Sequence, residues 1–481
     1  MKKKQIVKKA VILLIWLGLW QVTALCVKNP IYFASPAEVA AALFEKLPTA
    51  AFRESVIGSL IRILYGFLFS FFLGYLSAFA AHKLTWLGDF LSPFITFLKS
   101  VPIAAVVVIL LIWWGPRYLV LCISMMVVFP NIYSNMRTGL GSIDPGLPEL
   151  AKVYRIPLKE RFFWIYRPAY LPYLHSAVSV SLGICFKSGI AAEVIGLPER
   201  SIGEQLYRDK IYLNTAGVFA WIIVVLALSA LTERVILKGM KLLAQKPAAI
   251  VESAAVSKEN TQGRSSREQD LHERKAQEGA GTAAAYEEKP VLNAQGIRKS
   301  YDGKIFVDTD VTMESGRLYC LKAPSGSGKT TLLRVLAGLD GPDEGHVDAG
   351  RISMVFQENR LIERGNVFRN LLFAGCEGDL QAELAGLLPE RTFLLPASSL
   401  SGGEKRRLCI AMALLSPSDI VILDEPFAGL DEATRLTTAE WILAHLQGRA
   451  LLFTTHETDP EILSGARTVA LYKYAKLPQN S

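Results

Sequence analysis

The sequence predicts an α-helical membrane domain of six transmembrane spans, followed by an α/β domain with a nucleotide-phosphate site. Long apolar runs crowd into the first half of the 481 residues. The second half alternates short apolar runs with helical stretches, as a parallel sheet requires. In that half a glycine-rich loop, Ala323 to Thr331, lies between a predicted strand and a predicted helix, which is the context of a phosphate-binding loop.

The composition indicates that one part of the chain lies in a membrane and another part in water. A hydrophobic fraction of 51% with 20% charged residues is high for a wholly soluble protein, and the length suits two or three domains. The net charge of +8 comes partly from Lys and Arg beside the apolar spans, so we expect contact with membrane lipid and no nucleic acid. Six scattered cysteines form no metal-spaced pair, which indicates unpaired thiols.

The amino terminus has two interpretations. Five lysines in residues 1–9 precede an apolar run from Ala10, as in a cleaved signal peptide or in a retained first helix. Bulky Leu25 before Cys26 argues against cleavage, so we expect a retained helix whose lysines stay in the cytoplasm.

Five further apolar runs are long enough to cross about 30 Å of hydrocarbon. An even number of crossings returns the chain to the cytoplasm, and the inward loop 137–170 is basic whereas the outward segment 197–214 is balanced. Lys99 and Pro102 interrupt one of these runs. The predicted spans lie near 57–81, 91–114, 118–136, 173–196 and 215–237.

Composition also sets the expected domain boundaries. Residues 247–290 hold few large apolar side chains, which favours a disordered tether. We therefore expect a membrane domain at 1–246, a nucleotide-binding domain at 291–475 and a tail at 476–481.

The glycine-rich loop predicts binding of ATP with Mg²⁺. Successive backbone N–H groups at a helix N-terminus form an anion site, Lys329 reaches the outer phosphates, and the Thr330 hydroxyl holds the metal. Asp424 ends the apolar strand 420–423 and completes the metal shell, while Glu425 is placed to polarise the attacking water. The expected ATP-binding residues of the loop are Pro324, Ser325, Gly326, Ser327, Gly328, Lys329, Thr330 and Thr331.

The first position of this loop is Ala323, where glycine is usual. A methyl group there is tolerated if the local φ is negative and costs binding if φ is positive. We expect activity to be retained.

Residues 291–475 resemble the nucleotide-binding domain of an ABC transporter. The resemblance implies a signature motif, with Glu404 where glutamine is common, a Q-loop at Gln357, a D-loop at Asp431, a switch histidine at His456 and an adenine-stacking ring at Tyr301. It implies that Gln357 joins Thr330 and Asp424 around Mg²⁺, and that Gln357 and His456 assist Glu425. Tyr301 as a half-exposed strand residue and His456 as a polar core residue stay open. The signature residues are Ser401, Gly402, Gly403 and Glu404.

In that family the signature of one domain closes over ATP bound in the other. The resemblance therefore implies a homodimer, or pairing with a second permease or ATPase chain.

The first half resembles two groups of permeases. Glu149, Ala151, Ile165 and Pro168 resemble the coupling loop of type I importers, from which Leu150, Arg155 and Arg167 depart. Segments 32–36, 98–102, 128–133 and 185–196 resemble permeases for nitrate, sulfonate, taurine, bicarbonate and thiamine precursors.

These resemblances imply ATP-driven import of a small solute, an anion or a thiamine-precursor-like compound, across the bacterial plasma membrane. The ATPase domain would be cytoplasmic, and a separate extracytoplasmic binding protein would deliver the solute. An exporter and a membrane-anchored ATPase that transmits force are the alternatives.

Two ionisable residues, Lys187 and Glu193, lie inside an apolar span. Such groups are costly in hydrocarbon, so they face a pathway or a partner. Six residues correspond to about 240° of helix rotation, so the two do not pair on one face. That one of them lines the solute pathway, and that each is neutralised by another helix, are both open.

Overall fold

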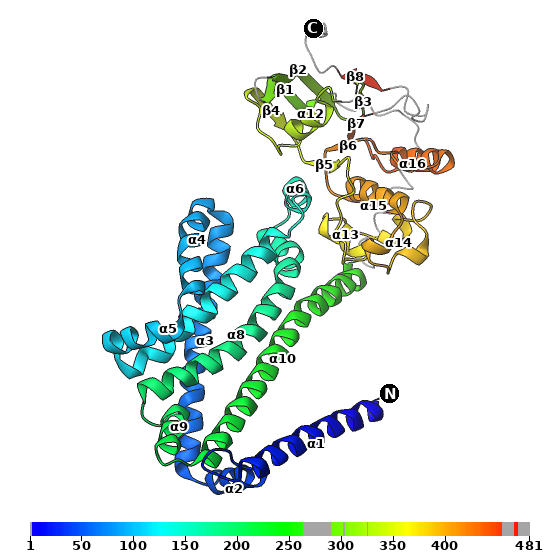
Figure 1. Cartoon of the computed structure of the whole chain (residues 1–481). Helices are drawn as coiled ribbons and strands as arrows, with labels where there is room; N and C mark the ends of the chain where they lie inside the picture. The colour runs from blue at the N-terminus through cyan, green and yellow to red at the C-terminus, as the bar shows by residue number, and fades with distance from the viewer. Residues whose placement is uncertain (1, 263–289, 302–303, 325, 455–465, 470–481) are drawn as a thin grey trace. The chain divides into compact units, whose positions relative to one another are not determined.

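A computed structural model describes residues 2–262, 290–301, 304–324, 326–454 and 466–469 (Figure 1). By its internal contacts the chain divides into two units, Met1–Ser142 with Pro168–Ala248, and Ile143–Arg167 with Ala249–Ser481. The loop 143–167, which the sequence assigns to the membrane domain, thus belongs to the nucleotide-binding unit.

The first unit is helical. Its helices are α1 (Lys2–Val27), α2 (Pro36–Lys46), α3 (Ala50–Lys83), α4 (Thr85–Ser100), α5 (Ile103–Gly141), α8 (Arg167–Gly196), α9 (Ile202–Ile211) and α10 (Thr215–Gln262). By length and composition, four helical stretches among the described residues could cross a membrane, namely 50–83, 103–141, 158–196 and 215–242, and Val11–Val27 is a shorter apolar helix.

The boundaries of two predicted spans are corrected by the structure. The run expected at 91–114 is divided between α4 and α5, because Pro102 has no backbone N–H to continue α4. The gap expected between 114 and 118 is a kink inside α5, at Gly115 with φ 71° and ψ 177° before Pro116. The six-span count stays a prediction.

Helices α3 and α5 pack closely because small residues line one side of α3. Gly66, Ser70, Gly74 and Ala78 repeat every four residues and are buried. A Cβ at Gly66 would lie 2.6 Å from the Ser124 Oγ of α5, so only glycine permits this approach. Small residues at such spacing let membrane helices pack tightly.

Helix α10 continues through the domain boundary expected at residue 246. Residues 247–262 are helical, which differs from the predicted tether, and 263–289 lie outside the described residues.

The second unit contains the strands. A parallel sheet has the order β5-β6-β7-β3-β8, and an antiparallel sheet has the order β2-β1-β4. The strands are β1 (Pro290–Tyr301), β2 (Lys304–Glu314), β3 (Leu318–Leu321), β4 (Glu344–Ala349), β5 (Ile352–Val355), β6 (Ile420–Leu423), β7 (Ala450–Thr454) and β8 (Arg467–Val469). Strands β6 and β7 are buried throughout, as expected for a parallel sheet covered on both faces.

Helices complete this unit. They are α6 (Gly146–Val153), α7 (Leu158–Arg161), α12 (Lys329–Leu336), α13 (Val367–Phe373), α14 (Leu380–Glu383), α15 (Gly402–Leu415) and α16 (Glu432–Ala444). A π-helical turn, Phe162–Tyr166, and the 3-10 turns Glu390–Thr392 and Ala397–Ser399 join them. Leu150, Ala151, Ile156 and Ile165 are part of the same hydrophobic core as the strands.

Candidate functional site

The phosphate loop connects β3 to α12, as the sequence predicts. Gly326 and Gly328 have φ values of 76° and 101°, a region that glycine adopts at little cost. A Cβ at Gly328 would lie 2.4 Å from the Phe306 carbonyl oxygen. Pro324 and Ser327 lie in the loop, Thr331 lies in the first turn of α12, and Ser325 is outside the described residues.

Lys329 and Thr330 are placed for phosphate and metal. Lys329 is 8% exposed, and its ammonium donates to the Ala323 carbonyl at 2.7 Å, across the mouth of the loop. Ala323 is not among the described non-glycine residues with positive φ, so its methyl group meets the condition for tolerance. The Thr330 hydroxyl donates to Asp424 Oδ2 at 3.1 Å.

The Asp424 carboxylate is buried and suits Mg²⁺. It accepts hydrogen bonds from the hydroxyls of Thr330, at 3.1 Å, and Thr454, at 3.0 Å, and burial raises its pKa. Carboxylate and hydroxyl oxygens are the hard ligands that Mg²⁺ prefers, and a divalent cation would offset the desolvation of Asp424. The residues present therefore fit the metal.

Glu425 and Gln357 follow neighbouring strands. β5 and β6 pair in parallel, with Val355 opposite Leu423, so both residues leave the same edge of the sheet. Glu425 has φ 52°, and its N–H donates to Thr454 Oγ1 at 2.7 Å. Gln357 is exposed. His456 follows β7 and lies outside the described residues.

Arg406 is a site residue that sequence reasoning missed. It is only 2% exposed, and its guanidinium donates to the carbonyls of Phe356 at 2.5 Å, Glu425 at 2.7 Å and Pro426 at 3.2 Å. It also donates to the carbonyls of Asp424 and Gln357. Burial lowers its pKa. Arg406 thus joins the segment that carries Gln357 to the segment that carries Asp424 and Glu425.

Tyr301 is the last residue of β1 and is 44% exposed. The ring makes an edge contact with Phe306 at 5.7 Å between centroids, and its hydroxyl donates to Asp340 Oδ2 at 3.4 Å. An exposed aromatic face of this kind can stack on adenine.

The signature residues begin α15. Ser401 is the N-cap, its hydroxyl accepts from the Glu404 N–H, and Glu404 in turn accepts from the Ser401 N–H at 2.8 Å. Glu404 is therefore the second residue of a capping box, a position that either glutamate or glutamine can occupy. Ser401 and Gly402 are exposed and Gly403 is half-buried. Asp431 is the N-cap of α16, where its carboxylate accepts from the Thr434 N–H at 2.9 Å.

The coupling loop of the sequence analysis packs on this unit through Glu149. Its two carboxylate oxygens accept from Arg334 at 2.8 and 2.9 Å, and Oε2 also accepts from Arg360 at 2.5 Å. The Arg334 hydrogen bonds, together with those of Arg360, lower the pKa of Glu149 to about 2. Arg334 lies on α12, five residues after Lys329, and Arg360 lies three residues after Gln357.

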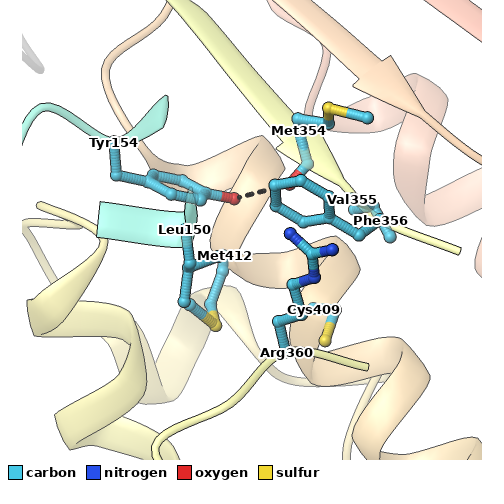
Figure 2. Close-up of a pocket in the computed structure, with 8 residues that line it drawn as sticks. All are labelled: Leu150, Tyr154, Met354, Val355, Phe356, Arg360, Cys409 and Met412. Carbon is cyan, nitrogen blue, oxygen red and sulfur yellow. Dashed lines mark hydrogen bonds between the residues drawn. The ribbon is translucent and has the colours of Figure 1, made fainter. Parts of the chain in front are cut away.

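A pocket beside Glu149 receives the apolar side of the loop. Figure 2 shows the Tyr154 hydroxyl directed at the Met354 carbonyl, at 3.3 Å, and Leu150 among the lining residues. The Arg360 guanidinium lies 3.8 Å from the centroid of the Phe356 ring. The loop thus contacts the end of β5, directly before Gln357.

The structure shows where the other residues of the predicted coupling loop lie. Ala151 is fully buried in α6, and Ile165 is buried in the π-helical turn. Pro168 lies at the start of α8, in the first unit, and not in the short helix on which Glu149 lies. Arg155, where the resembling motif has glycine, has φ 52°, the conformation that explains the usual glycine.

The two candidate pathway residues, Glu193 and Lys187, lie in different environments. Glu193 is fully buried and accepts from Ser59 Oγ at 2.5 Å, Arg62 Nε at 3.0 Å and the Gly203 N–H at 3.3 Å. This placement agrees with the alternative in which another helix neutralises Glu193. Lys187 is exposed on α8.

These features define an ATP-binding domain of the phosphate-loop class joined to a helical membrane unit. Residues 306–428 match the family model described as ABC transporter, and residues 70–237 match the model described as binding-protein-dependent transport system inner membrane component.

The second half of the chain is similar to known proteins. The aliphatic sulfonates import ATP-binding protein SsuB 1 of Nocardia farcinica is 38% identical over 37% of this chain and 77% of its own length. SsuB of Corynebacterium glutamicum is 38% identical over 36% of this chain and 77% of its own length. A crystal structure of a nucleotide-free ATP-binding cassette from an ABC transporter is 20% identical over 38% of this chain and 88% of that chain, with a TM-score of 0.34.

The chain belongs to the ABC transporter family, as a permease and an ATPase of the import branch fused in one polypeptide. ATP hydrolysis in the second unit is coupled to transport.

Proposed function

We propose that this protein imports a small organic or inorganic anion, with a sulfonate as the first candidate, across the bacterial plasma membrane. Two copies act together with Mg-ATP and a separate extracytoplasmic binding protein. The related ATPases named for aliphatic sulfonate import support this choice. Nitrate, taurine, bicarbonate and a thiamine-precursor-like compound are the other solutes to be compared.

The observation that carries the proposal is the double contact of Glu149. One carboxylate binds the helix that begins at the phosphate loop, through Arg334, and the segment that follows Gln357, through Arg360. A displacement of either element moves the loop that leads into α8. We infer that nucleotide binding is transmitted through these side chains to the segment that leads into α8.

We infer the nucleotide chemistry from the phosphate loop, the carboxylates beside it and the resemblance to ABC transporters. Lys329 would bind the outer phosphates in place of its bond to Ala323, and Thr330, Asp424 and Gln357 would hold Mg²⁺, whose charge would offset that of the phosphates. The Glu425 carboxylate orients the attacking water, with His456 as its expected partner. Arg406 binds the backbone carbonyls of Asp424, Glu425 and Gln357 and so fixes the positions of these three residues.

Closure requires a second copy. Ser401 is exposed at the N-terminus of the 14-residue helix α15, where a hydroxyl, backbone N–H groups and the helix dipole favour an anion. In the proposed homodimer this surface covers the ATP of the other copy, and Asp431 lies at the same junction. Hydrolysis then removes the shared ligand and lets the domains part.

Uptake into vesicles tests the proposed function. The chain is reconstituted with its co-expressed binding protein and ATP on the side of the ATPase domain, and labelled ethanesulfonate is offered on the opposite side. We expect accumulation that requires Mg-ATP and is abolished by Lys329→Ala. Import would be contradicted if the label moved only away from the side of the membrane that holds the ATPase domain. It would also be contradicted if ATP were hydrolysed but none of the five solute types crossed the membrane.

A further inference from the structure

The second segment of α5, after the kink at Gly115, has one polar face. Asn131, Ser134, Asn135 and Thr138 follow the spacing i, i+3, i+4, i+7, which places them on one side of the helix. The first three are half-buried and Thr138 is exposed. Because polar side chains are costly against lipid, such a face turns toward protein or water.

Asn131 lies well inside α5, whereas Thr138 is three residues from its C-terminal end. At a rise of 1.5 Å per residue, Asn131 is about 24 Å from the kink at Gly115 and about 15 Å from the end of the helix at Gly141. Asn131 also donates to Ser181 Oγ of α8 at 2.7 Å. The polar face therefore joins two of the helices that are long enough to cross the membrane.

A cation lies against the face. Lys99, in the last turn of α4, donates from Nζ to Ser134 Oγ at 2.7 Å. Lys99 is exposed, and within the described parts of the chain no acidic side chain forms an ion pair with it. An ammonium has three N–H donors, of which this hydrogen bond uses one.

Glu193 has a charged partner in the described structure, whereas Lys99 has none. Glu193 is buried, and Arg62 lies 3.0 Å from it on a neighbouring helix. Lys99 belongs to α4, a 16-residue helix beside the span α5, and a charge next to a membrane span is stabilised by a counter-charge or by water. Lys99 has a hydroxyl as its neighbour and a second face open, so a diffusing anion can supply the counter-charge.

We propose that Lys99 and the Ser134 side of α5 form an anion-binding position on the route of the solute through the membrane unit. The ammonium and hydroxyl groups donate hydrogen bonds, which suits a small oxyanion such as a sulfonate or nitrate. A cation would be repelled at the same position. This inference rests on the proposed function and specifies the residues that select its substrate class.

Thiol labelling tests the position without knowledge of the natural solute. Cys26 is the exposed cysteine and the other five are buried, so a Cys26→Ser chain is the parent. Ser134→Cys is added, and the full chain in lipid nanodiscs reacts with the anionic sulfonatoethyl or the cationic trimethylammonioethyl methanethiosulfonate. We expect the anionic reagent to react at least about tenfold faster, because Lys99 attracts one and repels the other.

The controls separate charge from structure. Lys99→Met should bring the two rates to within about twofold, and Lys99→Arg should keep most of the preference for the anion. Lys83→Met, which removes the same charge at the exposed end of α3, should leave the ratio unchanged. Ethanesulfonate at millimolar concentration should slow the anionic reagent.

Two results would overturn the inference. One is equal reactivity toward both reagents with Lys99 present. The other is no labelling at Ser134→Cys and at Thr138→Cys while both variants elute as folded, monodisperse protein. ATP-driven sulfonate uptake with either result would leave the proposed function intact, whereas anion-selective labelling without any uptake would contradict import and leave the anion position intact.

Discussion

The carboxylate of Glu149 binds the guanidinium of Arg334 through two parallel hydrogen bonds, at 2.8 and 2.9 Å, although the residues are 185 positions apart. Bidentate pairs of this kind fix orientation as well as proximity. Arg334 also binds Asp340, whose other partner is the Tyr301 hydroxyl. The coupling loop is thus connected to the phosphate loop helix and to the candidate adenine-stacking ring.

Glu149→Gln should uncouple ATP hydrolysis from import. The amide keeps the size of the side chain but loses a charged hydrogen-bonding partner worth about 2 kcal/mol, a factor of about 30 in an equilibrium. We expect at least about a tenfold fall in solute imported per ATP, with ATPase activity retained, measured in the same vesicles. Glu160→Gln, an exposed change in the same loop, is the control, and equal losses in both variants would refute the assignment.

The Glu149 contact should be insensitive to pH in the physiological range. Its folded-state pKa of about 2 lies below its usual value of 4.5, so its contribution to stability is fully present above about pH 4.5 and is lost as pH falls toward 2. The difference in melting temperature between wild type and Glu149→Gln should therefore stay constant from pH 8 to 5.5 and narrow below 4.5. A difference that already narrows between pH 7 and 6 would contradict this pairing.

Arg406→Met should destabilise the nucleotide-binding unit and abolish ATPase activity. The change leaves several buried carbonyls without a donor, at a cost of at least about 3 kcal/mol. Arg406→Lys should rescue little, because one ammonium cannot reach the carbonyls of both segments. Thermal unfolding monitors the loss, with Arg391→Met, a 73% exposed arginine, as control. Unchanged melting of Arg406→Met would refute the bridging role.

The phosphate loop should tolerate Ala323→Gly and reject Gly328→Ala. Ala323 already has a negative φ, so the glycine variant should bind ATP within about twofold of wild type. At Gly328 a Cβ would lie 2.4 Å from the Phe306 carbonyl oxygen at a φ of 101°, so binding should be lost. Equilibrium binding of a fluorescent ATP analogue measures both, and the reverse order of effects would contradict the loop geometry.

The residues predicted best from the sequence are those whose chemistry is local. Gly326, Gly328, Lys329 and Thr330 lie in one short motif between β3 and α12, and Asp424 follows the apolar strand β6. Arg406 lies in an ordinary helix, and its role arises from carbonyls of segments near residues 356 and 425. The one sequence feature that could have suggested it is its place two residues after the signature Glu404.

The sequence does not predict which side chains contact each other in the membrane unit. Glu193 could line a pathway or pair with another helix, and only the fold brings Arg62 and Ser59 to it. The interruption at Lys99 and Pro102 was visible, but the contact of Lys99 with Ser134 depends on the packing of α4 against α5. Glu149 was identified by resemblance, whereas Arg334 and Arg360 as its partners required the structure.

The most direct test of the account measures closure between two copies. Glu425→Gln is combined with Cys26→Ser and Leu394→Cys, a position 79% exposed in the described structure, and a spin label is attached at residue 394 of the full chain in nanodiscs. The account predicts that saturating Mg-ATP narrows and shortens the distance distribution between the two labels, and that Lys329→Ala prevents the change. A distribution unaffected by Mg-ATP, or no coupling between two labels, would contradict ATP-driven closure of paired chains.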